Sequence, residues 1–104
     1  MQKAKIKVQI YFSKTGLMRF ISHLDLIRVF QRALRRTNLK LYFTEGFSPH
    51  LKISFKRALK LGLESENEEV AIYLSEKVEP EKLKTSLQEQ LPQGIFIKDV
   101  NLLN

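Results

Sequence analysis

Apolar and polar residues alternate over several short stretches of the chain. Residues 6–12 carry isoleucine, valine and phenylalanine at every second position, with lysine, glutamine and tyrosine between them. A period of two predicts a β-strand with one buried face and one wet face. The same alternation predicts further strands over residues 39–44, 51–56, 70–74 and 95–100.

Two other segments repeat apolar residues at spacings of three and four, the period of a helix with one buried side. Ser22, followed by Asp25, forms a start similar to a capping box, so a helix is expected to begin near residue 23 and to stop at Asn38. Its apolar stripe consists of Leu26, Ile27, Phe30, Ala33 and Leu34. Leucines spaced by four after Pro80 predict a second helix that ends before Pro92.

The predicted order is strand, helix, three strands, helix, strand. This order fits an α+β fold of the ferredoxin-like split βαβ type, an antiparallel sheet with two helices on one face. The hairpin over residues 39–55 is either an insertion into that scheme or its second strand. The length of 104 residues and the lack of a Pro-, Gly- or Ser-rich linker predict a single domain over residues 1–104.

Charge is distributed unevenly along the chain. The net charge is +7, but Lys and Arg dominate residues 1–60, where Asp25 and Glu45 are the only acids, whereas acids dominate residues 61–104. Such asymmetry predicts a basic surface that attracts a polyanion, with plain solubility or an acidic protein partner as alternatives.

The composition also excludes several classes of function. Without cysteine there is no disulfide, no cysteine-based zinc or iron–sulfur site and no thiol nucleophile. No signal-peptide stretch and no apolar run of 18 residues is present, so we expect a cytoplasmic protein with no membrane partner.

Basic side chains suggest where an anion would bind. On the first helix, four arginines at i, i+4, i+7 and i+8 project from one side, where they either grip phosphate or simply face solvent. The turn after the first strand, residues 13–16, adds a lysine beside a hydroxyl and a glycine. The predicted nucleic-acid-binding residues are Lys14, Arg19, Arg28, Arg32, Arg35, Arg36 and Lys52.

Tyr11, Tyr42 and Tyr73 alternate with the apolar positions of their strands, which places them on the sheet face opposite the helices. Lysines stand beside them in the sequence: Lys5, Lys7, Lys40 and Lys52. Aromatic rings next to cations are typical of a platform on which unpaired bases stack. Surface tyrosines without a ligand are the alternative.

Two histidines are the remaining chemistry-bearing residues. If the loops meet, His23, Asp25 and His50 supply either a two-histidine, one-carboxylate metal site or an acid–base pair. Structural hydrogen bonding or contact with a partner is favoured for both histidines. We therefore expect no metal site, no cofactor and no assigned catalytic residue.

Several motifs together resemble a bacterial radical-SAM-linked domain of unknown function, which occurs alone or fused after cobalamin-binding radical-SAM proteins. The matching segments are Phe12-Ser13-Lys14-Thr15-Gly16, residues 19–26, residues 32–36, the loop Gly46-Phe47-Ser48-Pro49-His50 and residues 61–65. The resemblance implies a bacterial cytoplasmic accessory to radical-SAM modification, associated with RNA metabolism. It also implies that His23, Asp25, Arg35, Arg36, Phe47 and His50 are motif residues, and that the chain corresponds to the N-terminal half of a longer protein.

The sequence thus predicts an RNA-binding module, for tRNA or rRNA, that serves a radical-SAM partner and is a binding domain rather than an enzyme. One alternative is an adaptor that docks on the radical-SAM protein without RNA. A second, by analogy of fold alone, is a metal-independent endoribonuclease that uses His23 or His50.

Overall fold

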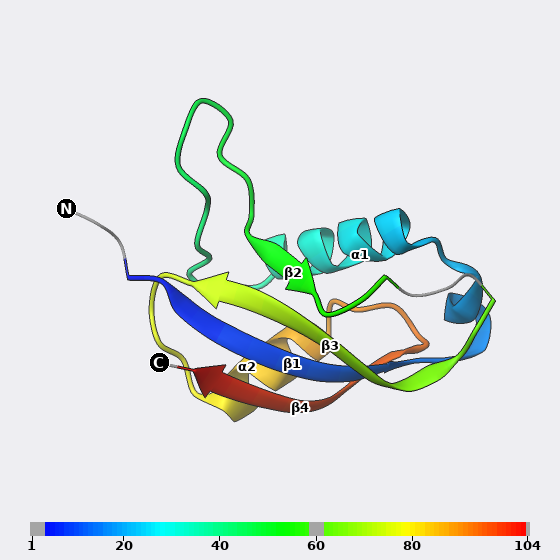
Figure 1. Cartoon of the computed structure of the whole chain (residues 1–104). Helices are drawn as coiled ribbons and strands as arrows, with labels where there is room; N and C mark the ends of the chain where they lie inside the picture. Colours follow the sequence, from blue (N-terminus) through cyan, green and yellow to red (C-terminus); the bar gives the residue numbers. More distant parts are fainter. Residues whose placement is uncertain (1–3, 59–61, 104) are drawn as a thin grey trace.

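The computed structural model describes residues 4–58 and 62–103, which form one antiparallel sheet with two α-helices on one face (Figure 1). Its elements are β1 (Ile6–Lys14), a 3-10 helix η1 (Gly16–Phe20), α1 (His23–Arg35), β2 (Ile53–Phe55), β3 (Ser65–Leu74), α2 (Pro80–Gln88) and β4 (Ile95–Leu103). The strand order is β2-β3-β1-β4, and every neighbouring pair is antiparallel. This is an α+β fold with a ferredoxin-like arrangement, as predicted.

The core lies between the sheet and the helices. Val8, Ile10 and Phe12 of β1 and the leucines of α2 are fully buried. Four of the five predicted stripe residues of α1 are buried as well, whereas Ile27 is only partly buried. Three phenylalanine rings pack together, since the centroid of Phe30 lies 5.1 Å from Phe12 and 5.4 Å from Phe55. Residues 8, 10 and 12 therefore face the helices, and their odd-numbered neighbours face away from them.

The predicted start of α1 is confirmed, but its predicted end is not. The hydroxyl of Ser22 accepts a hydrogen bond of 3.1 Å from the backbone N–H of Asp25, which confirms the predicted cap. The expected left-handed stop at Asn38 is wrong, because α1 ends at Arg35 and no described non-glycine residue has a positive φ. Instead, the hydroxyl of Thr37 donates to the Leu34 carbonyl at 2.6 Å and turns the chain away.

The predicted pair of strands over 39–44 and 51–56 is only partly formed. Residues 39–44 make two isolated bridges, Leu41 with Leu74 and Phe43 with Leu51, and the sheet takes up only Ile53–Phe55 as β2. Before Leu41 the segment lies past the end of β3 at Leu74, and after Leu41 the edge of β3 is already paired with β2, from Ile72 onward. The hairpin is an insertion between α1 and β2 that projects from the body of the molecule (Figure 1).

The second half of the chain follows the predicted order with shifted limits. Strand β3 begins at Ser65, five residues before the expected start, and β4 continues to Leu103. Helix α2 has Pro80 in its first turn, as predicted. None of the helices within the described ranges is long and apolar enough to cross a membrane.

Candidate nucleic-acid interface

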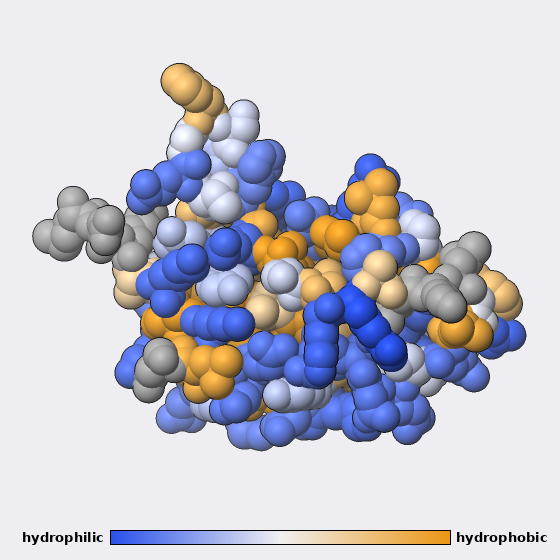
Figure 2. Space-filling model, in the orientation of Figure 1, coloured by the Kyte–Doolittle hydropathy of each residue, from blue (hydrophilic) through white to orange (hydrophobic). Residues whose placement is uncertain are grey.

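The sheet face opposite the helices is open and mostly polar. Strand register places Lys7 of β1 beside Tyr73 of β3, and Tyr11 beside Glu69. All four residues alternate with buried ones and therefore lie on this open face. Figure 2, in the same orientation as Figure 1, shows mainly hydrophilic residues over the sheet.

Two tyrosines and two lysines meet at one end of the open face and form what we call the lysine–tyrosine cluster: Lys5, Tyr42, Lys52 and Tyr73. The Nζ atoms of Lys5 and Lys52 lie 5.2 and 5.3 Å from the centroid of the Tyr73 ring. Lys5 Nζ also lies 5.7 Å from the centroid of the Tyr42 ring. Each lysine is thus within cation–π distance of an aromatic ring, and both rings remain partly accessible.

Backbone hydrogen bonds hold the members of the cluster together. The N–H of Tyr42 donates to the carbonyl of Tyr73 at 3.0 Å, and the N–H of Lys52 donates to the carbonyl of Tyr42 at 3.4 Å. The segment around Tyr42 therefore extends the sheet beyond β2, although it is too short to count as a strand. Residues that are far apart in the sequence are brought to one surface in this way.

The two ends of the open face differ in electrostatics. At the end away from the cluster, Glu69 accepts hydrogen bonds from Lys56 Nζ at 2.7 Å and from Gln9 Nε2 at 3.2 Å. The bond and the charge of Glu69 raise the pKa of Lys56. In contrast, neither Lys5 nor Lys52 has a carboxylate within 4.0 Å among the residues that the structure describes. The cluster end is therefore the positive end.

The predicted nucleic-acid-binding residues do not form one surface. Arg32 and Arg35 of α1 and Arg36 at its C-cap are exposed in the helix layer. They take part in no ion pair within the described part of the chain. Arg28, on the same helix, pairs with Asp25 at 3.2 Å. Of the predicted set, Lys52 is the member that lies in the lysine–tyrosine cluster.

The remaining two predicted cations occupy other places. The guanidinium of Arg19 lies 4.4 Å from the centroid of the Phe20 ring and donates to the carbonyl of Gly16 at 3.1 Å. Lys14 is only 1% exposed, so it is a core residue and is not available to a macromolecule. We therefore leave Lys14 out of the proposed interface.

The two histidines and Asp25 do not come together. The ring of His23 packs edge-on against Phe55, with centroids 5.2 Å apart, and its buried Nδ1 has no hydrogen-bond partner among the described residues. His50 belongs to the projecting hairpin at the other end of α1 (Figure 1). Across residues 4–58 and 62–103, no group of three histidine or acidic side chains is placed to hold a metal ion.

One comparison identifies the family. The family model described as "Uncharacterized protein conserved in bacteria (DUF2344)" matches residues 7–104, which is nearly the whole chain. The chain belongs to this family. No curated protein and no solved structure matches it.

The motif loop of this DUF2344 chain, residues 46–50, forms the end of the projecting hairpin. Two hydrogen bonds close its base: the N–H of Thr44 donates to the carbonyl of His50 at 2.8 Å, and the N–H of His50 donates to the hydroxyl of Thr44 at 2.9 Å. Phe47 is fully exposed. Because the hairpin starts from Tyr42 and returns to Lys52, the loop stands directly beyond the lysine–tyrosine cluster.

A buried polar cluster at the opposite end of the sheet escaped the sequence analysis. Glu68 is only 2% exposed and accepts hydrogen bonds from Arg57 and from the hydroxyl of Ser65. Burial alone raises the pKa of Glu68, but these hydrogen bonds and the charges of Arg57 and Lys14 lower it below its usual value. Burial lowers the pKa of Lys14, and Glu68 partly opposes that shift.

Proposed function

We propose that this DUF2344 protein is an RNA-binding module that stacks unpaired bases on the lysine–tyrosine cluster. The observation that supports this most is the Tyr73 ring within 5.3 Å of the amines of both Lys5 and Lys52, on a sheet face that no helix covers. The lysines have no carboxylate partner among the described residues. They are therefore available to phosphates.

Base stacking suits this geometry because every base has a flat face, whichever its identity. Each base stacked on an aromatic side chain contributes about 1–3 kcal/mol to binding. Tyr42 and Tyr73 offer two neighbouring rings, joined through their backbones, on which successive bases can lie. Paired bases cannot use such a surface, so the proposed ligand is a single-stranded loop or end of tRNA or rRNA.

The motif resemblance supports a context for this binding. We infer that the domain works in the bacterial cytoplasm beside a radical-SAM enzyme and presents RNA to it. The domain itself then needs no catalytic group. His23 and His50 lie apart, so the geometry does not favour an endoribonuclease that needs both imidazoles in one site.

The proposal is tested by titrating a labelled single-stranded RNA at several salt concentrations. Lys52→Gln should weaken binding and reduce the log–log salt slope by about 0.7, the value for one phosphate contact on a single strand. Lys84→Gln removes the same charge from α2, where Lys84 Nζ donates to the carbonyl of Lys98, and should change neither quantity. Equal effects of the two variants, or a salt-independent affinity, would contradict the proposal.

A second function is favoured by one specific observation. Arg32, Arg35 and Arg36 are exposed and without ion pairs among the described residues, yet they lie in the helix layer and not on the open sheet face. An acidic surface of the radical-SAM partner would complement them. In that case the Arg32→Glu variant loses the partner in a nuclease-treated pull-down, while its affinity for RNA stays close to that of the wild type.

A further inference from the structure

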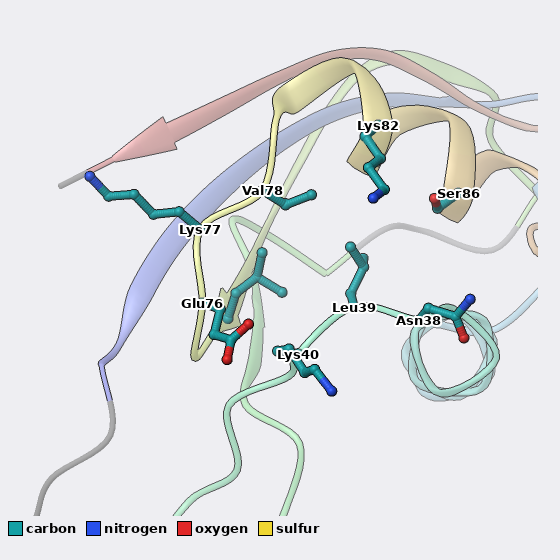
Figure 3. Close-up of a pocket in the computed structure, with 9 residues that line it drawn as sticks. Asn38, Leu39, Lys40, Glu76, Lys77, Val78, Lys82 and Ser86 are labelled. Carbon is teal, nitrogen blue, oxygen red and sulfur yellow. The ribbon is translucent and has the colours of Figure 1, made fainter.

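A pocket of about 280 Å³ opens between the end of α1, the connection from β3 to α2, and α2 itself (Figure 3). It lies in the helix layer, so it is separate from the lysine–tyrosine cluster on the open face. Its apolar wall is formed by Leu39, Leu74 and Val78. Its size is just below the range of about 300–1,000 Å³ for small-molecule sites, which suits a ligand smaller than a dinucleotide.

Two hydrogen-bond donors share one side of this pocket. Lys82 and Ser86 are four residues apart on α2 and therefore lie on the same side of the helix. Figure 3 shows the amine of Lys82 and the hydroxyl of Ser86 turned toward the same space, with Leu39 facing them across it. The side chain of Asn38 lies beside Leu39 at the end of α1, on the wall opposite α2.

The charges that line the pocket favour an anion. Three lysines, Lys40, Lys77 and Lys82, line the pocket together with one carboxylate, that of Glu76. Figure 3 shows the amine of Lys82 turned into the pocket, whereas the amines of Lys40 and Lys77 point away from it. None of these lysines has an ion pair within 4.0 Å in the part of the chain that the structure describes. An amine together with a hydroxyl is a suitable donor set for phosphate oxygens.

We infer that this pocket binds a nucleoside monophosphate unit, with the phosphate at Lys82 and Ser86 and the base against Leu39 and Val78. Glu76 lies on the other side of the pocket from Ser86, where its carboxylate can accept hydrogen bonds from ribose hydroxyls (Figure 3). The inference depends on these side chains alone and does not require RNA binding at the lysine–tyrosine cluster.

Two sources supply this chemistry: a free nucleotide and the phosphorylated end of an RNA strand. An RNA end in the pocket would lie near the open face, because residues 40–42 lead from the pocket to the lysine–tyrosine cluster. The carbonyl of Lys40, whose residue lines the pocket, accepts hydrogen bonds from the N–H and hydroxyl of Ser75 at 2.8 and 3.3 Å. Tyr42, two residues further, belongs to the lysine–tyrosine cluster.

The experiment is an amide NMR titration of the full chain with AMP, adenosine and inorganic phosphate. AMP should bind saturably and shift Asn38, Lys82 and Ser86 most, and both of its fragments should bind more weakly. Lys82→Gln should weaken AMP binding about tenfold, the effect of one charged hydrogen bond. Lys84→Gln carries the same change on the other side of α2 and should leave binding unchanged.

Three outcomes would overturn the inference: no saturable AMP binding, equal affinity for AMP and inorganic phosphate, or equal losses in the Lys82 and Lys84 variants. A 5′-phosphorylated RNA that binds more tightly than its 5′-hydroxyl form, with this difference lost in Lys82→Gln, identifies the RNA end as the source. Equal binding of the two RNAs, beside saturable AMP binding, identifies the free nucleotide. Tyr73→Ala should leave AMP binding intact, which separates a failure of this inference from a failure of the proposed function.

Discussion

The guanidinium of Arg57 holds the buried carboxylate of Glu68 through two hydrogen bonds, from Nε at 3.1 Å and from Nη2 at 2.7 Å. Glu68 in turn lies close enough to the buried amine of Lys14 for each charge to alter the pKa of the other. Lys14 is the last residue of β1, Glu68 lies near the start of β3, and Arg57 follows the end of β2 by two residues. The contacts therefore link three neighbouring segments of the sheet. This buried polar cluster stabilises one end of the sheet, as apolar packing stabilises the rest.

Glu68→Gln should therefore destabilise the fold. The variant weakens the hydrogen bonds that Arg57 and Ser65 donate to a buried side chain and takes the charge of Glu68 away from the buried Lys14. Because the Arg57 side chain is 64% exposed and stays solvated, we expect a cost of about 1–3 kcal/mol. Glu69→Gln, one residue along β3, breaks only the ion pair with the exposed Lys56 and should cost at most about 1 kcal/mol. Chemical denaturation of both variants measures the difference, and similar costs would show that Glu68 contributes no more than a surface carboxylate.

The same carboxylate should make stability depend on acid pH. Because the pKa of Glu68 is lower in the folded state than in the unfolded chain, its stabilising contribution is complete above the unfolded value. As the pH falls below the usual carboxyl pKa of 4.5 and through the lowered value, the unfolded state takes up the proton first and stability decreases. Melting temperatures between pH 6 and pH 2 should fall more steeply for the wild type than for Glu68→Gln, and parallel curves would refute this role.

Gly94 should tolerate a side chain less well than Gly46. Both have positive φ angles, of 101° and 122°, so alanine strains the backbone at either position. A Cβ at Gly94 would also lie 2.7 Å from Met18 Cγ and from the Thr15 carbonyl oxygen, whereas nothing lies within 4 Å of a Cβ at Gly46. Gly94→Ala should thus cost about 1–3 kcal/mol more than Gly46→Ala in the free energy of unfolding, and an equal cost would rule out the close contact.

Tyr73 should contribute to RNA affinity through its ring and not through its hydroxyl. Tyr73→Ala is expected to lose about 1–3 kcal/mol of binding free energy, and Tyr73→Phe should keep most of it. Tyr11→Ala removes a tyrosine from the same face, but beside Glu69 and away from the lysine–tyrosine cluster, and should have little effect. Fluorescence anisotropy with a labelled RNA compares the three variants, and a Tyr11 effect as large as that of Tyr73 would argue against a localised platform.

Much of the fold could be predicted from the sequence because burial follows the period of each element. The alternation in β1 and the stripe in α1 each identify the side that faces the core. The segment 39–44 alternates just as well, yet it forms only bridges, because β3 ends at Leu74 and β2 already pairs with the rest of its edge. A local pattern carries no information on the length of a neighbouring strand.

The candidate site was less predictable. The alternation along each strand predicts that the tyrosines and Lys52 lie on the open sheet face. The contact of Lys5 with Tyr42 depends instead on packing between segments distant in the sequence. The burial of Lys14 and Glu68 has a signal in the sequence, since Lys14 shares the parity of Phe12 and Glu68 that of Val70. Two opposite charges at core-facing positions of adjacent strands indicate a buried pair rather than a phosphate site.

The most direct measurement for the proposed function is an amide NMR map of the chain during titration with a short single-stranded RNA. We expect the largest shifts at Lys5, Tyr42, Lys52 and Tyr73, with the far end of the open face, around Glu69, little changed. Shifts centred on Arg32, Arg35 and Arg36, or no saturable change anywhere, would contradict binding at the lysine–tyrosine cluster.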